Sequence, residues 1–452
     1  MRGVKAATVS LGLFVVVALA ACGAGPSAAV CNPGASDACV CTNGASGAQV
    51  CNPQGTGFDT CVCDSDAEGD AVGGGDIEAD EQGASTGSWP PPVGEWSAVE
   101  PGGDTICARG TPFRFYVYGG DPNRIVMDFL GGGACWDSFS CEVGREIQGQ
   151  SVFTDSAGTL EELQAMHEAG ELEGIYALDN PDNPYKGWTM IRVPYCTGDF
   201  YWGNATVDYT DTLKVHHRGF DNAKAVTAWV TGHYPDVTRL VASGCEAGAY
   251  GSLNQAMALA DFYPEATVAA LADSGVGVIT ESFFADAFMI WNAFSSMPLH
   301  LDGLAGKALE DVTVKDVTIA ASNSHPNLRV AQYTTAYDVL QSFHYMFMGG
   351  AMEDWHAAAL SSLEYIRARA PNFRYYLAPG PIHCVTPHDI TYSREVNGVR
   401  FSDWLKVLST EEVVPPDVVC EGDGCRDDPL CAGCQDGSIE SVVCGWCDGW
   451  SP

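Results

Sequence analysis

Four groups of residues in this chain have the types and order needed for acyl transfer at a carbonyl carbon. That chemistry needs a nucleophile on a tight turn, a histidine that moves its proton, an acid that orients the histidine, and N–H groups that stabilise the oxyanion. The turn is the sequence GCEAG at residues 244–248, between an apolar run and a helix-like stretch. It has the outline of a nucleophile elbow, in which a strained strand-to-helix turn lifts one side chain above a sheet. The lifted residue is normally Ser, and here it is Glu246.

The other three groups are found before and after this turn. A glycine run, residues 131–133, follows a strand-like apolar segment and can bring bare N–H groups close to a reacting carbonyl. Asp338 and His383 follow Glu246 in the chain, each just past a strand-like run. Alone, such an Asp is usually a helix cap and such a His a loop residue. Together, in the order acid then histidine, they favour a catalytic arrangement.

Aromatic and polar residues at strand ends are suited to lining a substrate pocket. Trp136 follows the glycine run, and the segment VPYCTGDFYWGN carries Tyr195, Asp199 and Trp202. We expect these four side chains to line the pocket.

The elements that must position these residues alternate along the chain. Several strand-length runs lack polar alternation, which indicates strands buried on both faces. Alternating strands and helices predict an α/β fold with a doubly wound, mostly parallel sheet. The expected strands are 113–118, 125–130, 189–193, 238–242, 267–271, 328–333 and 373–377, and the expected helices are 220–232, 247–261, 281–294, 354–370 and 401–408.

With these motifs the chain resembles the pectinacetylesterase/Notum family of carboxylesterases over roughly residues 97–410. The resemblance rests on FLGGGACW, VPYCTGDFYWGN, HHRG, GCEAG, LADSG, AQYTTAYD and GPIH, in that order. It implies an α/β-hydrolase fold and removal of acyl groups from polysaccharides or, in the animal branch, from a lipidated protein. It also implies an oxyanion hole from Gly132, Gly133 and the Ala247 N–H, with Asp338 as the orienting acid and His383 as the base. The nucleophile of the family falls on Glu246.

Glu246 leaves three interpretations open, because a carboxylate is already ionised and gives His383 no proton to take. The site has lost ester hydrolysis and binds a ligand; or the carboxylate attacks an sp³ carbon and His then activates water; or Glu246 or His383 activates water directly on an ester. Ser243, in the strand, and Ser252, in the helix, are poor substitute nucleophiles. An ion pair between Glu246 and His383 would raise the pKa of the imidazole.

The N-terminus predicts export. Residues 1–21 form a signal peptide, since the apolar run from Leu11 to Ala20 is too short to span a bilayer. LAAC resembles a bacterial lipobox that would make Cys22 the lipidated first residue, anchoring the protein to the cell envelope, at the outer membrane or cell surface. Removing Cys22 from the 19 cysteines leaves an even 18, which fits full disulfide pairing in an oxidising compartment.

The remaining segments divide by composition. Residues 22–63 read as a Cys-rich stalk module, 64–95 as an acidic disordered linker, 96–410 as the hydrolase-like domain and 411–452 as a Cys-rich tail. The CxxC pairs at 431–434 and 444–447 have zinc-ribbon spacing, but outside the cell we expect disulfides. We expect no metal or cofactor.

The formal net charge of −36 excludes nucleic acid and other polyanions as natural partners, because they would be repelled. We expect instead an acylated carbohydrate or another small acyl ligand, bound by a monomer.

Overall fold

The computed structural model describes residues 36–40, 46–50, 62–63, 89–142, 153–308, 311–439, 441 and 443–448. The chain divides into two compact units, residues 1–80 and 81–452. The expected signal peptide, Cys22 and most of the expected linker lie outside the described residues. Among the described residues, no helix has both the length and the apolar character of a membrane span.

The first unit contains a small antiparallel sheet within the expected stalk module. Its strands are β1 (Ser36–Val40), β2 (Ser46–Val50) and β3 (Val62–Cys63), in the order β1-β2-β3.

The second unit is built on a nine-stranded sheet in the order β16-β13-β12-β11-β10-β6-β7-β5-β4. Strands β16 to β7 are parallel along this order, and β5 is antiparallel to both of its neighbours. The predicted α/β fold with a mostly parallel sheet is therefore confirmed. The strands are β4 (Trp96–Val99), β5 (Phe115–Tyr118), β6 (Asp121–Phe129), β7 (Trp188–Val193), β10 (Arg239–Cys245), β11 (Thr267–Asp273), β12 (Leu328–Thr335), β13 (Phe373–Ala378) and β16 (Val418–Val419), with hairpins β8 (Ala205–Thr210)–β9 (Leu213–His217) and β14 (Glu395–Val396)–β15 (Val399–Arg400) beside it.

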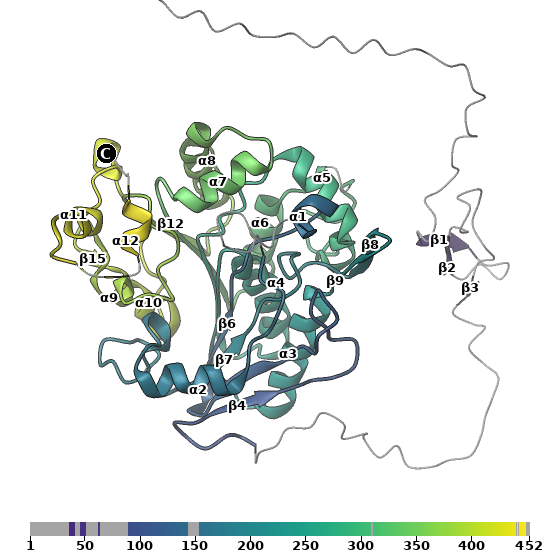
Figure 1. The fold of residues 1–452 in the computed structure, drawn as a ribbon, viewed down its shortest axis with the longest axis horizontal. Coiled ribbons are helices and arrows are strands. Elements are labelled where there is room, and N and C mark those ends of the chain that lie inside the picture. The colour runs from purple at the N-terminus through teal and green to yellow at the C-terminus, as the bar shows by residue number, and fades with distance from the viewer. Residues whose placement is uncertain are drawn as a thin grey trace, which may run out of the picture. The chain divides into compact units, whose positions relative to one another are not determined.

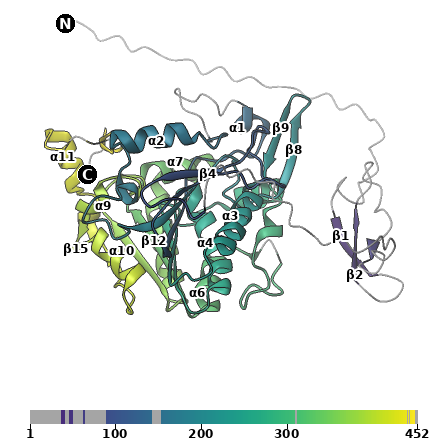
Figure 2. The same ribbon diagram turned by 90° about the horizontal axis from the view of Figure 1, so that it is seen from below.

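Helices cover both faces of this sheet, as a doubly wound fold requires. Figures 1 and 2 show α3, α4 and α6 on one face and α10 on the other. The central strands are buried along nearly their whole length, which accounts for their continuous apolar sequences. The helices are α1 (Ser138–Glu142), α2 (Leu160–Ala169), α3 (Gly219–His233), α4 (Ala247–Phe262), α5 (Glu281–Ile290), α6 (Val314–Ser324), α7 (Val339–Phe347), α8 (Trp355–Arg367), α9 (Ile390–Ser393), α10 (Phe401–Thr410), α11 (Pro429–Asp436) and α12 (Cys444–Cys447).

Two expectations need correction. The helix expected over 281–294 ends at Ile290, because Asn292 adopts a left-handed conformation with φ of 53°. The boundary expected at residue 410 does not end the sheet, since β16 pairs in parallel with β13 and adds an edge strand. The Cys-rich tail thus adds a strand to the sheet of the hydrolase-like domain.

Candidate functional site

The predicted strand–turn–helix is present at Glu246. β10 ends at Cys245, Glu246 has φ 55° and ψ −115°, and α4 begins at the next residue. The flanking glycines are required by close packing. A Cβ on Gly244 would lie 2.1 Å from the carbonyl oxygen of Gly248, and a Cβ on Gly248 would lie 1.9 Å from that of Phe129.

The Glu246 carboxylate lies in the N–H cradle of the glycine run. Its Oε2 accepts hydrogen bonds from the amides of Gly132, at 2.6 Å, and Gly133, at 2.9 Å, and its Oε1 accepts from Gly133 at 3.1 Å. These are two of the three donors expected for the oxyanion hole. The third, Ala247, is the fully buried first residue of α4. The side chain of the elbow residue therefore fills the position where these amides would bind an oxyanion of the substrate.

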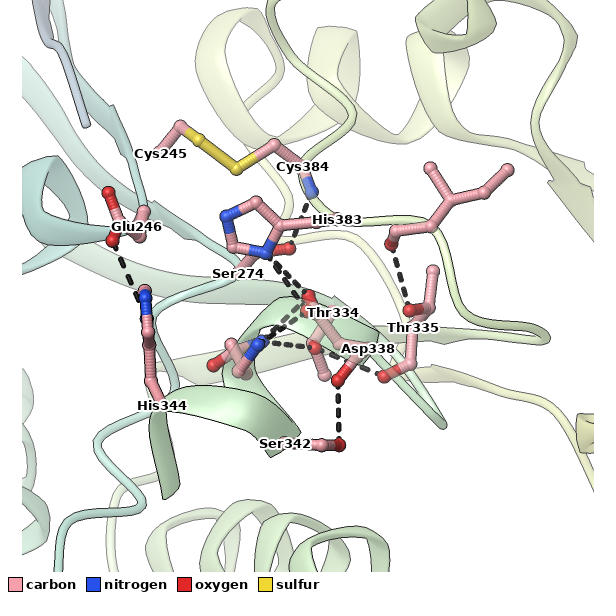
Figure 3. Close-up of polar contacts among 12 residues, drawn as sticks. Cys245, Glu246, Ser274, Thr334, Thr335, Asp338, Ser342, His344, His383 and Cys384 are labelled. Atoms are coloured by element: carbon pink, nitrogen blue, oxygen red, sulfur yellow. Dashed lines mark hydrogen bonds and ion pairs between the residues drawn. A yellow bond between two sulfur atoms is a disulfide. The ribbon is translucent and has the colours of Figure 1, made fainter. Parts of the chain in front are cut away.

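Asp338 and His383 form a buried hydrogen-bonded pair. Asp338 follows β12 as the N-cap of α7 and accepts from the backbone and side-chain nitrogens of Gln341, both at 2.9 Å. The His383 Nδ1 lies 2.9 and 3.0 Å from the two Asp338 oxygens (Figure 3). The two residues predicted from strand ends about 45 residues apart are thus brought into contact.

The electrostatics of this pair favour the imidazolium form of His383. Burial lowers the pKa of His383, but the charge and hydrogen bond of Asp338, together with the charges of Glu246 and Asp273, outweigh it, and the net pKa lies above the ordinary value. Glu246 adds to this rise in pKa through its charge. The raised pKa was expected, although Asp338 rather than Glu246 contributes most to it.

The imidazole nearest to the Glu246 carboxylate is not the expected His383, and burial lowers the pKa of this second histidine, His344. The Glu246 Oε1 lies 3.6 Å from the Nδ1 of His344, a residue of α7 that the sequence analysis did not identify. Figure 3 shows the His344 side chain approaching the carboxylate from the side opposite the Cys245–Cys384 disulfide. Among the described residues, the ion pair of His383 is with Asp338 alone. Glu246 therefore faces a second imidazole.

The loop that carries His383 is fixed to the end of β11. The Asp273 Oδ2 accepts from the Val385 amide at 2.9 Å and from the Thr386 amide and hydroxyl, both at 2.7 Å. Ser274 Oγ accepts from the Cys384 amide at 2.9 Å. Burial raises the pKa of the Asp273 carboxyl. The polar pair at the end of the LADSG segment was the sequence signal for this role.

A disulfide ties the two halves of the site together. Cys245 precedes Glu246, Cys384 follows His383, and the two cysteines are bonded to each other. The elbow and the histidine loop, 139 residues apart, are therefore covalently joined next to both functional side chains.

The residues expected to line the pocket are mostly structural. Asp199 is fully buried and accepts from Thr197 Oγ1 and from the Gly219 amide, both at 2.7 Å. The buried Trp202 donates to the carbonyl of Tyr250. Both side chains are buried and take part in hydrogen bonds within the protein, and the pocket role expected for Asp199 and Trp202 stays a prediction. The hydrogen bonds of Asp199 and Trp202 stabilise the loop of residues 193–204 that contains them.

Trp136 and Tyr195 lie differently. Trp136 is half-buried and its ring edge packs on Phe283. Tyr195 lines a cavity of about 300 Å³ that also borders Gly131, Thr154 and Arg192. This cavity borders the glycine run at Gly131, and Glu246, Asp338 and His383 are not among its lining residues.

The alternative nucleophiles are poorly placed. Ser243 and Ser252 are both fully buried, and the Ser252 hydroxyl donates to the carbonyl of Ala249. Neither is presented to substrate, as expected from their positions in β10 and α4.

Cysteine and histidine groups that could hold a metal are used in disulfides. The two such groups among the described residues contain Cys135 with Cys141 and Cys245 with Cys384, which are bonded as pairs. A disulfide sulfur is not a thiolate ligand. The tail cysteines also pair as expected, in the disulfides Cys420–Cys425, Cys431–Cys447 and Cys434–Cys444. This density of disulfides is typical of proteins outside the reducing cytoplasm.

Comparisons with known proteins agree with this fold. The family model of pectinacetylesterases matches residues 98–344, a stretch that includes Glu246 and Asp338 but ends before His383. Among solved structures, the Wnt deacylase Notum from Drosophila has a similar fold, with a TM-score of 0.50 and 15% sequence identity over 69% of this chain and 94% of the Notum chain. A comparison with curated protein sequences finds no match.

Proposed function

The chain belongs to the pectinacetylesterase family, and from this premise we propose that it is an exported, lipid-anchored member whose site binds an acylated ligand without hydrolysing carboxylic esters. The observation that supports the proposal is that the Glu246 carboxylate accepts hydrogen bonds from the Gly132 and Gly133 amides. Two further facts limit ester chemistry at this site.

The first is electrostatic. Acyl transfer develops negative charge on the carbonyl oxygen, and oxyanion-hole donors stabilise that charge by roughly 2.7–4 kcal/mol per donor. In this chain the donors already bind a carboxylate, so a substrate oxyanion would have to displace a like charge.

The second is the chemistry of the nucleophile. Glu246 has no hydroxyl proton for His383 to remove, and attack of a carboxylate on an ester would give an anhydride. The Asp338 carboxylate holds the His383 imidazole in place, but the imidazole has no hydroxyl proton at Glu246 to accept.

The proposed ligand is an acylated carbohydrate or another small neutral acyl compound. A net charge of −36 disfavours polyanions, which leaves a neutral ligand as the better fit. The LAAC sequence at Cys22 supports lipid anchoring to a bacterial envelope, and the disulfides support a site outside the cytoplasm.

Glu246→Ser tests the proposal directly. The wild type should release no acetate from a simple acetyl ester and should not react with a fluorophosphonate probe, whereas Glu246→Ser should gain both activities. The matched control is Glu246→Ser with His383→Ala, which should lose them again. Turnover by the wild type that is abolished in Glu246→Gln would overturn the proposal.

One observation favours a second candidate, hydrolysis at an sp³ carbon. Oε2 accepts from both amides, whereas Oε1 accepts only from Gly133 at 3.1 Å, so Oε1 is the less firmly held oxygen, and its neighbour is His344. Attack of Oε1 on the carbon of an epoxide or alkyl halide would form a glutamyl ester, while the C–X bond breaks to release halide or the epoxide C–O bond breaks to give an alkoxide that takes a proton from water. Water deprotonated by neutral His383 would then cleave the ester at its carbonyl, with Oε2 in the amide cradle, releasing the alcohol and regenerating the carboxylate.

Isotope labelling separates this candidate from the first. In a single turnover in ¹⁸O-water with a small epoxide, the label should enter the Glu246 carboxylate and the diol should carry ¹⁶O. If the diol alone carries the label, Glu246 is not the nucleophile.

A further inference from the structure

The tail beyond residue 410 is built onto the loop that carries His383. β16 lies beside β13, the strand that leads into this loop, and the Cys420 amide donates to the carbonyl of Leu377. The Gly380 amide donates to the carbonyl of Cys425. The tail therefore shares backbone hydrogen bonds with Leu377 and Gly380, the residues that lead into the histidine loop.

A buried ion pair fixes the next part of the tail. Asp428 caps α11 and lies 2.9 Å from Arg394, and both side chains are almost completely buried. A Cβ on Gly380 would lie 2.4 Å from the Cβ of Asp428, so this contact depends on glycine. The start of α11 is thereby held against the loop.

Trp446, near the C-terminal end of the described tail, lies beside the imidazole of His383. It is in α12, which two disulfides, Cys431–Cys447 and Cys434–Cys444, join to α11. Its ring centroid lies 5.8 Å from that of His383, edge to face, while His383 itself is 5% exposed. Trp446 is only half-buried, so part of the indole is open to solvent next to the functional imidazole.

We propose that Trp446 forms a wall of the ligand site and determines specificity, by packing its exposed indole surface against the apolar face of a neutral sugar ring that carries the acyl group. This inference rests on the proposed function for the nature of the ligand. An indole offers a large rigid contact surface that does not depend on charge, which suits a neutral ligand in a strongly acidic chain. The tail thus completes a site whose other residues come from the central sheet.

The position of Trp446 is tested in the chain with Glu246 intact. Diethyl pyrocarbonate modification of His383, followed by peptide mass spectrometry with the exposed His300 as internal reference, should be severalfold faster in Trp446→Ala than in wild type. Trp446→Phe should restore most of the protection. Equal rates of His383 modification in wild type and Trp446→Ala, with all disulfides intact, would overturn the proposal.

The specificity role is tested on the Glu246→Ser background. Adding Trp446→Ala should raise KM for a methyl glycoside acetylated on its ring hydroxyls about tenfold, equivalent to about 1.4 kcal/mol, with little change in kcat. It should leave kcat/KM for 4-nitrophenyl acetate, which has no sugar ring, nearly unchanged. Phe262→Ala, at an exposed aromatic of α4, is the control. Equal effects on both esters would overturn the role in sugar recognition.

The two proposals fail in different ways. If Glu246→Ser gains no esterase activity, the proposed function is contradicted. Whether Trp446 forms a wall of the site is then decided by the rate of His383 modification alone.

Discussion

The Gly132 amide lies 2.6 Å from the Glu246 carboxylate, within the loop expected to stabilise a substrate oxyanion. The protein thus holds its own anion at this position, and the adjacent Gly133 amide contacts both carboxylate oxygens. The elbow and the glycine loop support each other through these contacts, and the stability of one should depend on the other.

Gly131→Ala should destabilise this arrangement. Its Cβ would lie 2.8 Å from the carbonyl oxygen of Cys245 and 2.9 Å from the Glu246 Oε2. We expect the free energy of unfolding to fall by about 1–3 kcal/mol, as measured by chemical denaturation. Gly232→Ala, in α3 with open space around the new methyl group, is the control and should not destabilise the protein. Equal stability of the two variants would contradict the close approach at Gly131.

Removing the acid should change the pH dependence of stability. The pKa of His383 is raised in the folded protein, so its contribution to stability is fully present below the ordinary pKa of 6.5 and is lost as pH rises through the folded value. Asp338→Asn should abolish this loss of stability with rising pH, measured by denaturation at several pH values. Asp403→Asn, in an exposed ion pair with Arg400, should keep it. If the stability of the wild type does not fall as pH rises above 6.5, the raised pKa of His383 is refuted.

The disulfide between Cys245 and Cys384 should contribute more to stability than a short-range one. It closes a separation of 139 residues, whereas Cys420–Cys425 closes 5. Loop-closure entropy predicts a loss of about 5 kcal/mol for the double Ala variant of the first pair and about 2 kcal/mol for the second. Denaturation of both double variants compares them directly, and the reverse order would show that strain or residual structure dominates.

Asp273 should matter as an acceptor for the histidine loop. Asp273→Ala leaves the buried amides of Val385 and Thr386 without their partner, at a cost of about 1–3 kcal/mol for each. Asp273→Asn keeps one acceptor oxygen and should cost less. On the Glu246→Ser background, Asp273→Ala should also lower kcat, because His383 loses its support. If Ala and Asn variants are equally stable, the hydrogen bonds to this carboxylate are not what fixes the loop.

The sheet and the central turn could be predicted because their signals are local. Apolar runs of strand length placed β10 to β13 closely, and glycines at 244 and 248 indicated the elbow. Chain order then paired Asp338 with His383. These features depend on short stretches of sequence and on the topology that parallel strands impose.

The surroundings of the site could not be predicted, because they depend on which side chains meet in space. α7 was not among the expected helices, and it leaves Phe343, Met346 and Phe347 exposed. Without that helix there was no reason to place His344 near Glu246. The position of Trp446 depends on the two-residue strand β16, which is too short to carry a sequence pattern.

The backbone at residue 246 keeps φ 55° and ψ −115° although no alcohol is attached to it. A residue with a Cβ in such a region costs of order 1–3 kcal/mol, and proteins retain such costs where the surrounding structure fixes the conformation. The folded protein therefore retains a strained backbone at residue 246. The hydrogen bonds from the glycine-run amides to the Glu246 carboxylate help to hold this conformation. Exchange of the one side chain at position 246 for Ser would place a hydroxyl on this turn, between the glycine amides and the loop that carries His383.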